Sequence, residues 1–304
     1  MAILIRRAIV IANPASRQGK RLAEQARATL VSRSIDCDVV FTERPGHAAE
    51  LALEHAPHYD ALFALGGDGT VMEVAGAVSG SDARVGVLAG GTGNLLARAL
   101  GIPLSVRRAI PALLDGGELR IDLGRFDSGR RFAIAAGVGI DANMVAETPS
   151  WMKQRLGVMA YAIIGTRAAL RAVLRREFFR ARVTIDGAVH ERDAAAVMIA
   201  NFGAVLGNRI TLGPDIRTDD GVLDACVFSP RTLPDAMRIM SQLLRGRFDT
   251  DPSMFYGRGR DIRVETTPVL PWQADGELMG TTPFHVVAEP LAVRLLVPRL
   301  RASS

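Results

Sequence analysis

The chain of 304 residues contains only two cysteines, and their separation matches no metal-binding spacing. Cys37 and Cys226 are therefore predicted to be reduced thiols in or near a core, as is usual in a cytosolic protein. Aromatic residues make up only 5% of the chain, which argues against a single-strand nucleic-acid binder, because such proteins interleave aromatic and basic side chains. None of the five histidines has a convincing metal-ligand spacing.

Long apolar runs are also missing. No stretch approaches the roughly 18 apolar residues of a membrane span. The short apolar run at the start is interrupted by Arg6 and Arg7 and is followed by no small-residue cleavage site, so it predicts a first strand and not a signal peptide. Neither the P-loop pattern G-x-x-x-x-G-K-[ST] nor the dinucleotide fingerprint G-x-G-x-x-G occurs, which excludes two common nucleotide-binding classes.

Positive charge is in excess, with a net charge of +5. Charge alone does not distinguish nucleic acid from anionic lipid as a partner. The stretch Trp151–Arg182 carries eight lysines or arginines and one acid, and its apolar spacing predicts a helix over 152–178. This helix is either a core helix with a solvated basic face or a lip that meets anionic lipid and gives the protein peripheral membrane contact.

The first hundred residues alternate between short apolar runs and segments with helical spacing. This rhythm, with strands that are apolar on both faces, predicts a doubly wound, Rossmann-like α/β domain over residues 1–120. After residue 120 the chain reads as strands joined by short turns, including an Asp-Gly hairpin signal at Asp186-Gly187. We therefore predict an antiparallel β-sandwich over 121–291, with 292–304 returning to the first domain.

Two glycine-rich loops follow predicted strands of the α/β domain. The strand over 60–65 leads into Gly66-Gly67-Asp68-Gly69-Thr70, and the strand over 84–89 leads into Gly90-Gly91-Thr92-Gly93-Asn94. Ligands of open α/β sheets bind beyond the carboxyl ends of the strands, and glycine lets backbone N–H groups approach a phosphate. Each loop is thus either half of a phosphate cradle or a capped turn without a ligand. Thr70 and Glu73 also match a capping box, which predicts that Thr70 caps the following helix.

A third loop follows the first strand in "NPASRQGK". Its Asn13 and Ser16 are placed either to reach a nucleotide or to form an ordinary Asn-Pro turn before a helix.

At this point the sequence resembles the catalytic domain of the diacylglycerol, sphingosine and ceramide kinases, and in particular their soluble bacterial members. The resemblance covers nearly the whole chain. It rests on an ordered set of segments: "NPASRQGK", "TERPGHAAELA", "GGDGTVMEV", "VGVLAGGTGNLLARALGIP", "GVGIDANMV", "TDDGVLDACVF" and "QADGE".

The resemblance implies an ATP-dependent lipid kinase with Mg²⁺, whose active site lies between the α/β domain and the sandwich. It implies Glu277 as general base with Asp275 beside it, and Asp68 at the metal of the nucleotide. A further family metal site corresponds to Arg217, Asp220 and Val222. Together with the loop residues, the expected nucleotide contacts are Asn13, Ser16, Thr42, Gly66, Gly67, Asp68, Gly69, Thr70, Val71, Met72, Gly91, Thr92 and Gly93.

The sequence departs from the family pattern in two places, where Met72 replaces an asparagine and Leu95-Leu96 replace an Asp-Phe pair. Arg217, at the metal position, is also an awkward neighbour for a cation.

Several roles remain open on the residues alone. Asp68 either acts at the metal or closes an Asx turn, and the Asp275-Gly276-Glu277 segment is either catalytic or a hairpin turn with solvated acids. Asp141 either orients the substrate head group or serves a turn.

The acceptor lipid is likewise open among diacylglycerol, a sphingoid base, ceramide and phosphatidylglycerol. NAD kinase and a non-catalytic binding protein are the competing functions. A cytoplasmic protein at the inner membrane surface, without a nucleic-acid partner, is expected. A homodimer formed through edge strands of the sandwich is a further option.

Overall fold

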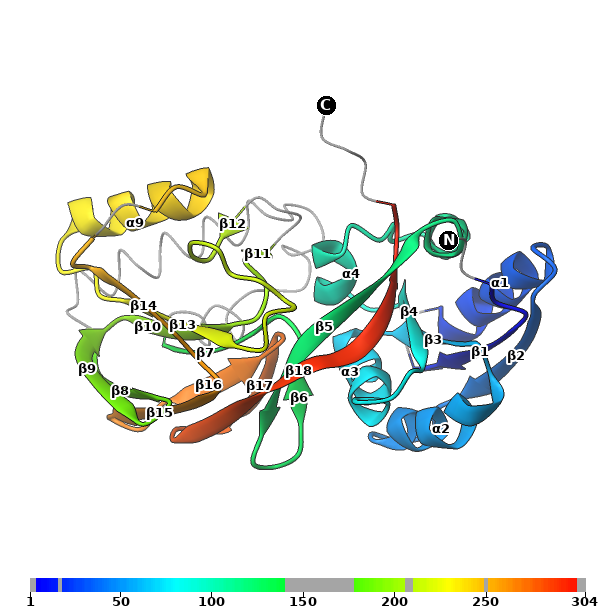
Figure 1. Cartoon of the computed structure of the whole chain (residues 1–304), viewed down its shortest axis with the longest axis horizontal. Coiled ribbons are helices and arrows are strands. Elements are labelled where there is room, and N and C mark those ends of the chain that lie inside the picture. The colour runs from blue at the N-terminus through cyan, green and yellow to red at the C-terminus, as the bar shows by residue number, and fades with distance from the viewer. Residues whose placement is uncertain (1–3, 16–17, 140–177, 206–209, 249–250, 300–304) are drawn as a thin grey trace. The chain divides into compact units, whose positions relative to one another are not determined.

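The computed structural model describes residues 4–15, 18–139, 178–205, 210–248 and 251–299. The chain forms two compact units (Figure 1). Unit 1 comprises Met1–Ile121 and Leu291–Ser304, and unit 2 comprises Asp122–Pro290. Ser16 and Asp141 lie outside the described residues, and so does the predicted helix 152–178 apart from its last residue.

Unit 1 is built on a parallel sheet with the strand order β2-β1-β3-β4-β18. Its core strands β1, β3 and β4 are apolar and buried, apart from the arginines that begin β1 and β4, as expected for a sheet covered on both faces. The strands are β1 (Arg7–Ala12), β2 (Asp36–Phe41), β3 (Ala61–Gly66), β4 (Arg84–Ala89) and the last part of β18 (Phe284–Val297).

Helices cover both faces of this sheet (Figure 1): α1 packs against α5 on one face, and α2 packs against α3 on the other. In α5 the buried residues Val106, Ala109, Ile110 and Leu113 follow helical spacing and turn one side of the helix to the core. The helices are α1 (Gly19–Val31), α2 (His47–His55), α3 (Asp68–Ala77), α4 (Leu95–Ala99) and α5 (Val106–Leu114), with a short 3₁₀ turn, η1 (Ala56–His58).

The strand order of unit 1 contains a switch point. The chain runs from β1 outward to β2 and then returns to the other side of β1, where it continues through β3 and β4. Loops that follow β1 and β3 therefore diverge at the carboxyl edge of the sheet, which is where ligands bind in open α/β sheets.

Unit 2 consists of two antiparallel sheets. The first has the order β14-β13-β10-β7-β16-β17, and the second is formed by β9, β8, β15 and the first part of β18. The strands are β7 (Ala135–Gly139), β8 (Phe179–Ile185), β9 (Ala188–Ala194), β10 (Ala196–Ala200), β13 (Leu223–Phe228), β14 (Met254–Gly259), β15 (Asp261–Thr267), β16 (Pro271–Ala274) and β17 (Glu277–Thr281).

The core of unit 2 lies between these sheets, and both contribute alternate side chains to it. Trp272 of the first sheet stacks on Phe284 of the second, with ring centroids 4.5 Å apart, and Phe126 packs against both rings. Asp186 and Gly187 have positive φ in the tight turn between β8 and β9, which confirms the predicted hairpin. The predicted fold class, an α/β domain followed by an antiparallel sandwich, is confirmed.

Helix α9 (Leu233–Arg245) covers the outer face of the first sheet of unit 2. Ile239 packs there with Cys226, Phe228 and Met254 in a second, smaller core. Cys226 and Cys37 are both buried free thiols, as predicted, and burial raises the pKa of the Cys37 thiol to about 11.

Two strands belong to both units. In β5 (Gly117–Phe126) the boundary falls at Ile121, and β6 (Arg131–Phe132) pairs with its far end. In β18 the residues 284–287 pair with β15, whereas Arg294 and Leu295 pair in parallel with β4. The two short strands β11 (Ala204–Val205) and β12 (Ile210–Thr211) form a separate ribbon.

Candidate functional site

The two glycine loops of unit 1 lie side by side at the carboxyl ends of β3 and β4. The parallel register pairs Gly66 with Ala89, so both loops begin at the same level of the sheet. The N–H of Gly90 donates to the carbonyl of Gly66 at 2.8 Å and extends the strand pairing into the loops. The two segments that the sequence singled out as a phosphate cradle are thus brought together by the fold.

Glycine is required here because the loops pack backbone against backbone. A Cβ atom on Gly91 would lie 2.6 Å from the Cα of Gly67, and one on Gly90 would lie 3.1 Å from the Cα of Gly66. Both distances are shorter than ordinary van der Waals contact. Close packing between loops, which sequence reasoning did not consider, accounts for these glycines whether or not a phosphate is bound.

Asp68 joins the two loops through its carboxylate. It begins α3, and its Oδ1 accepts a hydrogen bond of 2.6 Å from the N–H of Leu95, the first residue of α4. A Cβ on Gly93 would lie 2.6 Å from Asp68 Oδ2, so Gly93 leaves room for this carboxylate. In these contacts Asp68 holds the second loop against the first, and its role at the metal of the nucleotide stays a prediction.

Asn94 closes the second loop on itself. Its Oδ1 accepts from the N–H of Gly91 at 3.0 Å, while its Nδ2 donates to the carbonyl of the same residue at 2.8 Å. Asn94 adopts the left-handed conformation, with φ of 49°, which asparagine tolerates better than most residues. The side chain of Thr92, between these residues, stays exposed at the tip of the loop.

Asn13 and Thr70 meet beside the first glycine loop. The Nδ2 of Asn13 donates to Thr70 Oγ1 at 3.4 Å, and Asn13 Oδ1 accepts from the N–H of Ala15 in an Asx turn. The side chain of Asn13 therefore forms the expected turn and also contacts the loop after β3, while its contact with a nucleotide stays a prediction. Thr42 lies at the end of β2, where its N–H donates to the carbonyl of Ala12.

The predicted capping box at Thr70 and Glu73 is wrong. Helix α3 begins two residues earlier, at Asp68, and its N-cap Gly67 receives no side-chain hydrogen bond. The carboxylate of Glu73 accepts instead from the N–H groups of Gly46 and Ala48, at 2.9 and 3.2 Å. It therefore caps the start of α2, a role that no local pattern reveals because the partner lies 27 residues away.

Val71 and Met72 follow the loop in the first turn of α3. Val71 is buried, and its N–H donates to the carbonyl of Gly67 at 3.1 Å, so that group is committed to the helix. Met72 is half-buried. Both the side chain and the N–H of Val71 are thus used by the fold, and its contact with a nucleotide stays a prediction.

Asp275 and Glu277 lie in the turn between β16 and β17, where their surroundings differ sharply. Asp275 is 9% exposed. Its carboxylate accepts hydrogen bonds from three backbone N–H groups, those of Ala133 at 2.7 Å, Ile134 at 2.9 Å and Ala135 at 3.1 Å. A carboxylate so fully engaged anchors the turn and is poorly placed to accept a substrate proton.

Glu277 is open to solvent and paired. Its Oε2 lies 2.9 Å from Nη2 of Arg130, and the two side chains are 48% and 56% exposed. Sequence reasoning missed Arg130 because it lies 147 residues away in the chain. Of the two acids that the resemblance implied, only Glu277 has a carboxylate that a substrate can approach.

At the expected family metal site, Asp220 would supply a carboxylate and Arg217 and Val222 only backbone carbonyls, and the side chains of Arg217 and Asp220 are engaged in other contacts. Arg217 pairs with Asp219 at 3.1 Å, and the N–H of Val222 donates to Asp220 Oδ1 at 3.4 Å. The other oxygen of Asp220 accepts from the guanidinium of Arg258. In the described part of the chain, no group of three or more histidine, cysteine or acidic side chains is arranged to hold a metal.

Arg258 supplies positive charge at this position instead. Besides Asp220, it contacts Asp224, whose Oδ1 lies 3.0 Å from its Nε. Burial raises the pKa of Asp224 to about 6, and Arg258 acts against that shift. Among the residues that the structure describes, Asp224 Oδ2 is buried and has no hydrogen-bond partner, so removing the guanidinium would leave this carboxylate with little compensation. The carboxylate of Asp220 is thus already paired with Arg258, and the metal role of Arg217, Asp220 and Val222 stays a prediction.

The segment around Asp220 is anchored by two buried polar residues that no sequence motif singles out. Asp122 is fully buried, and its Oδ2 accepts from the N–H of Gly221 at 2.7 Å. Asn201 donates from Nδ2 to the carbonyls of Asp122 and Ala133, both at 2.8 Å. These contacts join segments distant in the chain, so only the fold reveals them.

Models of known protein families match both units. The diacylglycerol kinase catalytic domain matches residues 7–126, and the YegS C-terminal NAD kinase beta sandwich-like domain matches residues 133–297. An α/β unit with paired glycine loops, followed by this sandwich, defines a class of two-domain kinases.

Full-length relatives narrow the class. A diacylglycerol kinase of Staphylococcus aureus (strain bovine RF122 / ET3-1) is 30% identical over 286 residues, which cover 92% of this chain and 89% of that protein. An uncharacterized protein of Synechocystis sp. is 30% identical over 241 residues, but the matched part spans only 54% of that protein. The chain belongs to the diacylglycerol kinase family, a family of lipid kinases that use ATP.

A solved structure shares the fold. The crystal structure of a diacylglycerol kinase from Bacillus anthracis str. Sterne aligns with a TM-score of 0.72 at 21% identity, and the alignment covers 96% of this chain and 97% of that one. Among the described helices, none is long and apolar enough to cross a membrane.

Proposed function

We propose that the chain transfers the γ-phosphate of ATP to a primary hydroxyl group of a membrane lipid, with diacylglycerol as the first candidate. The observation that carries the proposal is the pair of glycine loops joined by Asp68 at the carboxyl edge of the unit 1 sheet. The names of the full-length relatives support the choice of lipid.

In this proposal the first loop and the start of α3 hold the phosphates of ATP. The first N–H groups of a helix have no partner within the helix, and the helix dipole favours an anion at that end. Asn13 and Thr70 border the loop with polar groups, and Thr92 offers an exposed hydroxyl from the second loop. Mg²⁺ enters as part of the MgATP substrate, where it offsets phosphate charge.

Glu277 is the proposed general base. It accepts the proton of the lipid hydroxyl while that oxygen attacks the γ-phosphorus and ADP departs. Its exposed carboxylate and the contact with Arg130 support this role, because the guanidinium fixes the direction of one oxygen. Asp275 is assigned a positioning role, since it holds the turn that carries Glu277.

A phosphorylation assay with γ-labelled ATP tests the proposal. The acceptors are diacylglycerol, sphingosine, ceramide and phosphatidylglycerol in mixed micelles, with NAD included because the sandwich resembles that of NAD kinases. We expect label in diacylglycerol. Label in another lipid would correct the substrate, and label in NAD alone, or in no acceptor, would contradict the proposal.

The role of Glu277 is tested with a matched pair of variants. Glu277→Gln is expected to lower kcat by about 100-fold or more, the usual contribution of a general base. Glu191→Gln is the control, because Glu191 is 44% exposed and also pairs with an arginine, Arg180, at 2.9 Å. Near-normal turnover of Glu277→Gln would remove Glu277 from the mechanism.

A further inference from the structure

Helix α9 of unit 2 exposes an apolar stripe. Leu233, Met237, Met240 and Leu244 are spaced by four, three and four residues, so they lie along one side of the helix. Met237 is 65% exposed and Leu244 is 50% exposed, with Leu233 also exposed and Met240 half-buried. A continuous row of large apolar side chains on an exposed helix is a common sign of an interaction surface.

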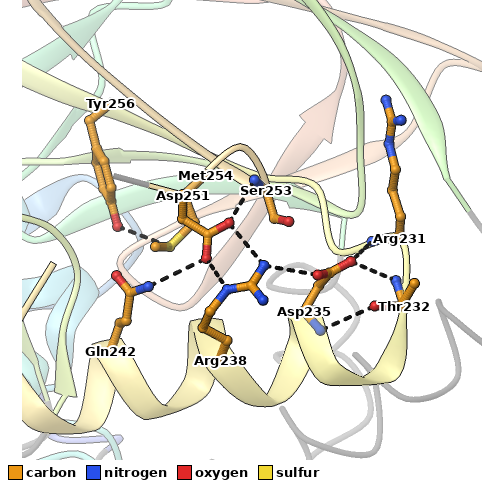
Figure 2. Close-up of polar contacts among 9 residues, drawn as sticks. All are labelled: Arg231, Thr232, Asp235, Arg238, Gln242, Asp251, Ser253, Met254 and Tyr256. Atoms are coloured by element: carbon orange, nitrogen blue, oxygen red, sulfur yellow. Dashed lines mark hydrogen bonds and ion pairs between the residues drawn. The ribbon is translucent and has the colours of Figure 1, made fainter. Parts of the chain in front are cut away.

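The other sides of α9 are already occupied. Ile239 and Leu243 pack into the smaller core of unit 2. On a further side, Arg238 binds the buried carboxylate of Asp251 and also Asp235, the latter at 2.9 Å (Figure 2).

The contacts drawn in Figure 2 hold α9 firmly in this orientation. Thr232 and Asp235 form a capping box at its start, Gln242 donates to Asp251 at 3.4 Å, and the N–H of Ser253 donates to the same carboxylate at 2.9 Å. These contacts fix both the N-terminus and the inner side of the helix. For this reason α9 cannot rotate to bury its apolar stripe without breaking them.

Positive charge borders the stripe. The segment 231–248 contains four arginines and a single acid, Asp235. Within the described ranges Arg245 and Arg247 have no acidic partner, and Arg231 contributes only its backbone N–H to the network while its guanidinium points away from it (Figure 2). Arginine side chains beside an apolar row can reach phosphate groups while the apolar residues enter a lipid layer.

We propose that α9 is a membrane-binding element, whose apolar stripe enters the interface of an anionic lipid bilayer while Arg231, Arg245 and Arg247 contact lipid phosphates. The proposal rests on the proposed function only in that the acceptor is a membrane lipid. Charge favours the bilayer over a second copy of this chain as the occupant. A two-fold dimer through this face would bring the same arginines together, whereas anionic head groups attract them.

The test is co-sedimentation of the full chain with phosphatidylcholine vesicles that contain 0% or roughly 30% phosphatidylglycerol, a range in which basic segments bind measurably. No ATP or acceptor turnover is needed. Wild-type protein is expected to partition at least about tenfold more strongly onto the anionic vesicles, and added salt should weaken this preference.

Two double variants at the proposed surface and two single variants elsewhere test where the membrane binds. We expect each double variant to reduce binding to anionic vesicles about tenfold or more. The first combines Met237→Glu with Leu244→Glu, and the second combines Arg245→Gln with Arg247→Gln. Leu53→Glu on α2 is the matched control, because Leu53 is also a helical apolar residue with 61% exposure. Glu277→Gln should bind vesicles like wild type, so failure of membrane binding and failure of the proposed chemistry are distinguishable.

Three outcomes would overturn the proposal. One is wild-type binding by both α9 variants, and another is equal loss of binding by Leu53→Glu. The third is a wild-type dimer in light scattering that becomes monomeric in the Met237→Glu, Leu244→Glu variant with vesicle binding unchanged, since a second copy would then be the occupant. Because all four substituted positions in and just after α9 are exposed, circular dichroism should show folded variants.

Discussion

At the scale of single residues, Asp275 and Glu277 show how two acids in one turn serve different purposes. Asp275 accepts three backbone N–H groups from the segment 133–135, whereas Glu277 faces solvent and pairs with Arg130. A buried acceptor of several hydrogen bonds contributes to stability, while an exposed ion pair contributes little. The two residues should therefore be separable by substitution.

Asp275→Asn is expected to lower the free energy of unfolding by about 2 kcal/mol or more, because the amide cannot replace a carboxylate that satisfies three buried N–H groups. Asparagine suits the backbone, since Asp275 has a φ of 46°, so the substitution tests the carboxylate alone. Urea unfolding measures the loss, and Glu277→Gln, expected to stay within about 0.5 kcal/mol, is the comparison. A fully stable but inactive Asp275→Asn would show that Asp275 takes part in the chemistry.

At the scale of elements, the two glycine loops are held together by direct contacts. Gly90 extends the strand pairing, Asp68 holds the start of α4, and Gly93 leaves room for Asp68. Displacing one loop should therefore alter the other, even where the substituted residue touches no ligand.

Gly93→Ala is expected to weaken ATP binding by about tenfold or more, which corresponds to about 1.4 kcal/mol. The added Cβ would lie 2.6 Å from Asp68 Oδ2 and push that carboxylate away from Leu95. Isothermal titration calorimetry measures the affinity. Gly117→Ala is the control, because a Cβ there meets nothing within 4 Å in the same unit. Equal affinity of the two variants would separate the loop contact from nucleotide binding.

At this scale the sequence predicts the local elements of the fold but not the contacts between distant segments. Apolar runs that alternate with helical spacing predict β1 to β4 and their helices, and Asp186-Gly187 predicts a hairpin, because these signals are local. The features that the sequence did not reveal are not local: the capping role of Glu73 and the ion-pair partners Arg130 and Arg258. Each depends on a contact between distant segments, which periodicity and short motifs cannot encode.

At the scale of the whole molecule, unit 1 depends on residues from both ends of the described chain. Leu295 pairs with Val85 of β4, and its side chain is fully buried, as is that of its neighbour Leu296. The last part of β18 is thus a core strand of the unit that carries the glycine loops.

Leu295→Ala is expected to lower the free energy of unfolding by about 2 to 4 kcal/mol, the usual result of truncating a buried leucine. Differential scanning calorimetry and urea unfolding measure the change. Leu53→Ala, at an exposed position of the same unit, should cost less than about 1 kcal/mol. Similar effects of the two substitutions would mean that the β18 strand is dispensable for unit 1.

The path of the chain through β18 has a consequence for synthesis on the ribosome. All of unit 2 emerges after the first 121 residues and before the strand that pairs with β4. Until then β4, in the described part of the sheet, has β3 as its partner on one side and an open edge on the other. Open edges can pair with foreign strands. The nascent α/β unit can therefore close its sheet only after β18 has been synthesised, and the edge of β4 is open to foreign strands until then.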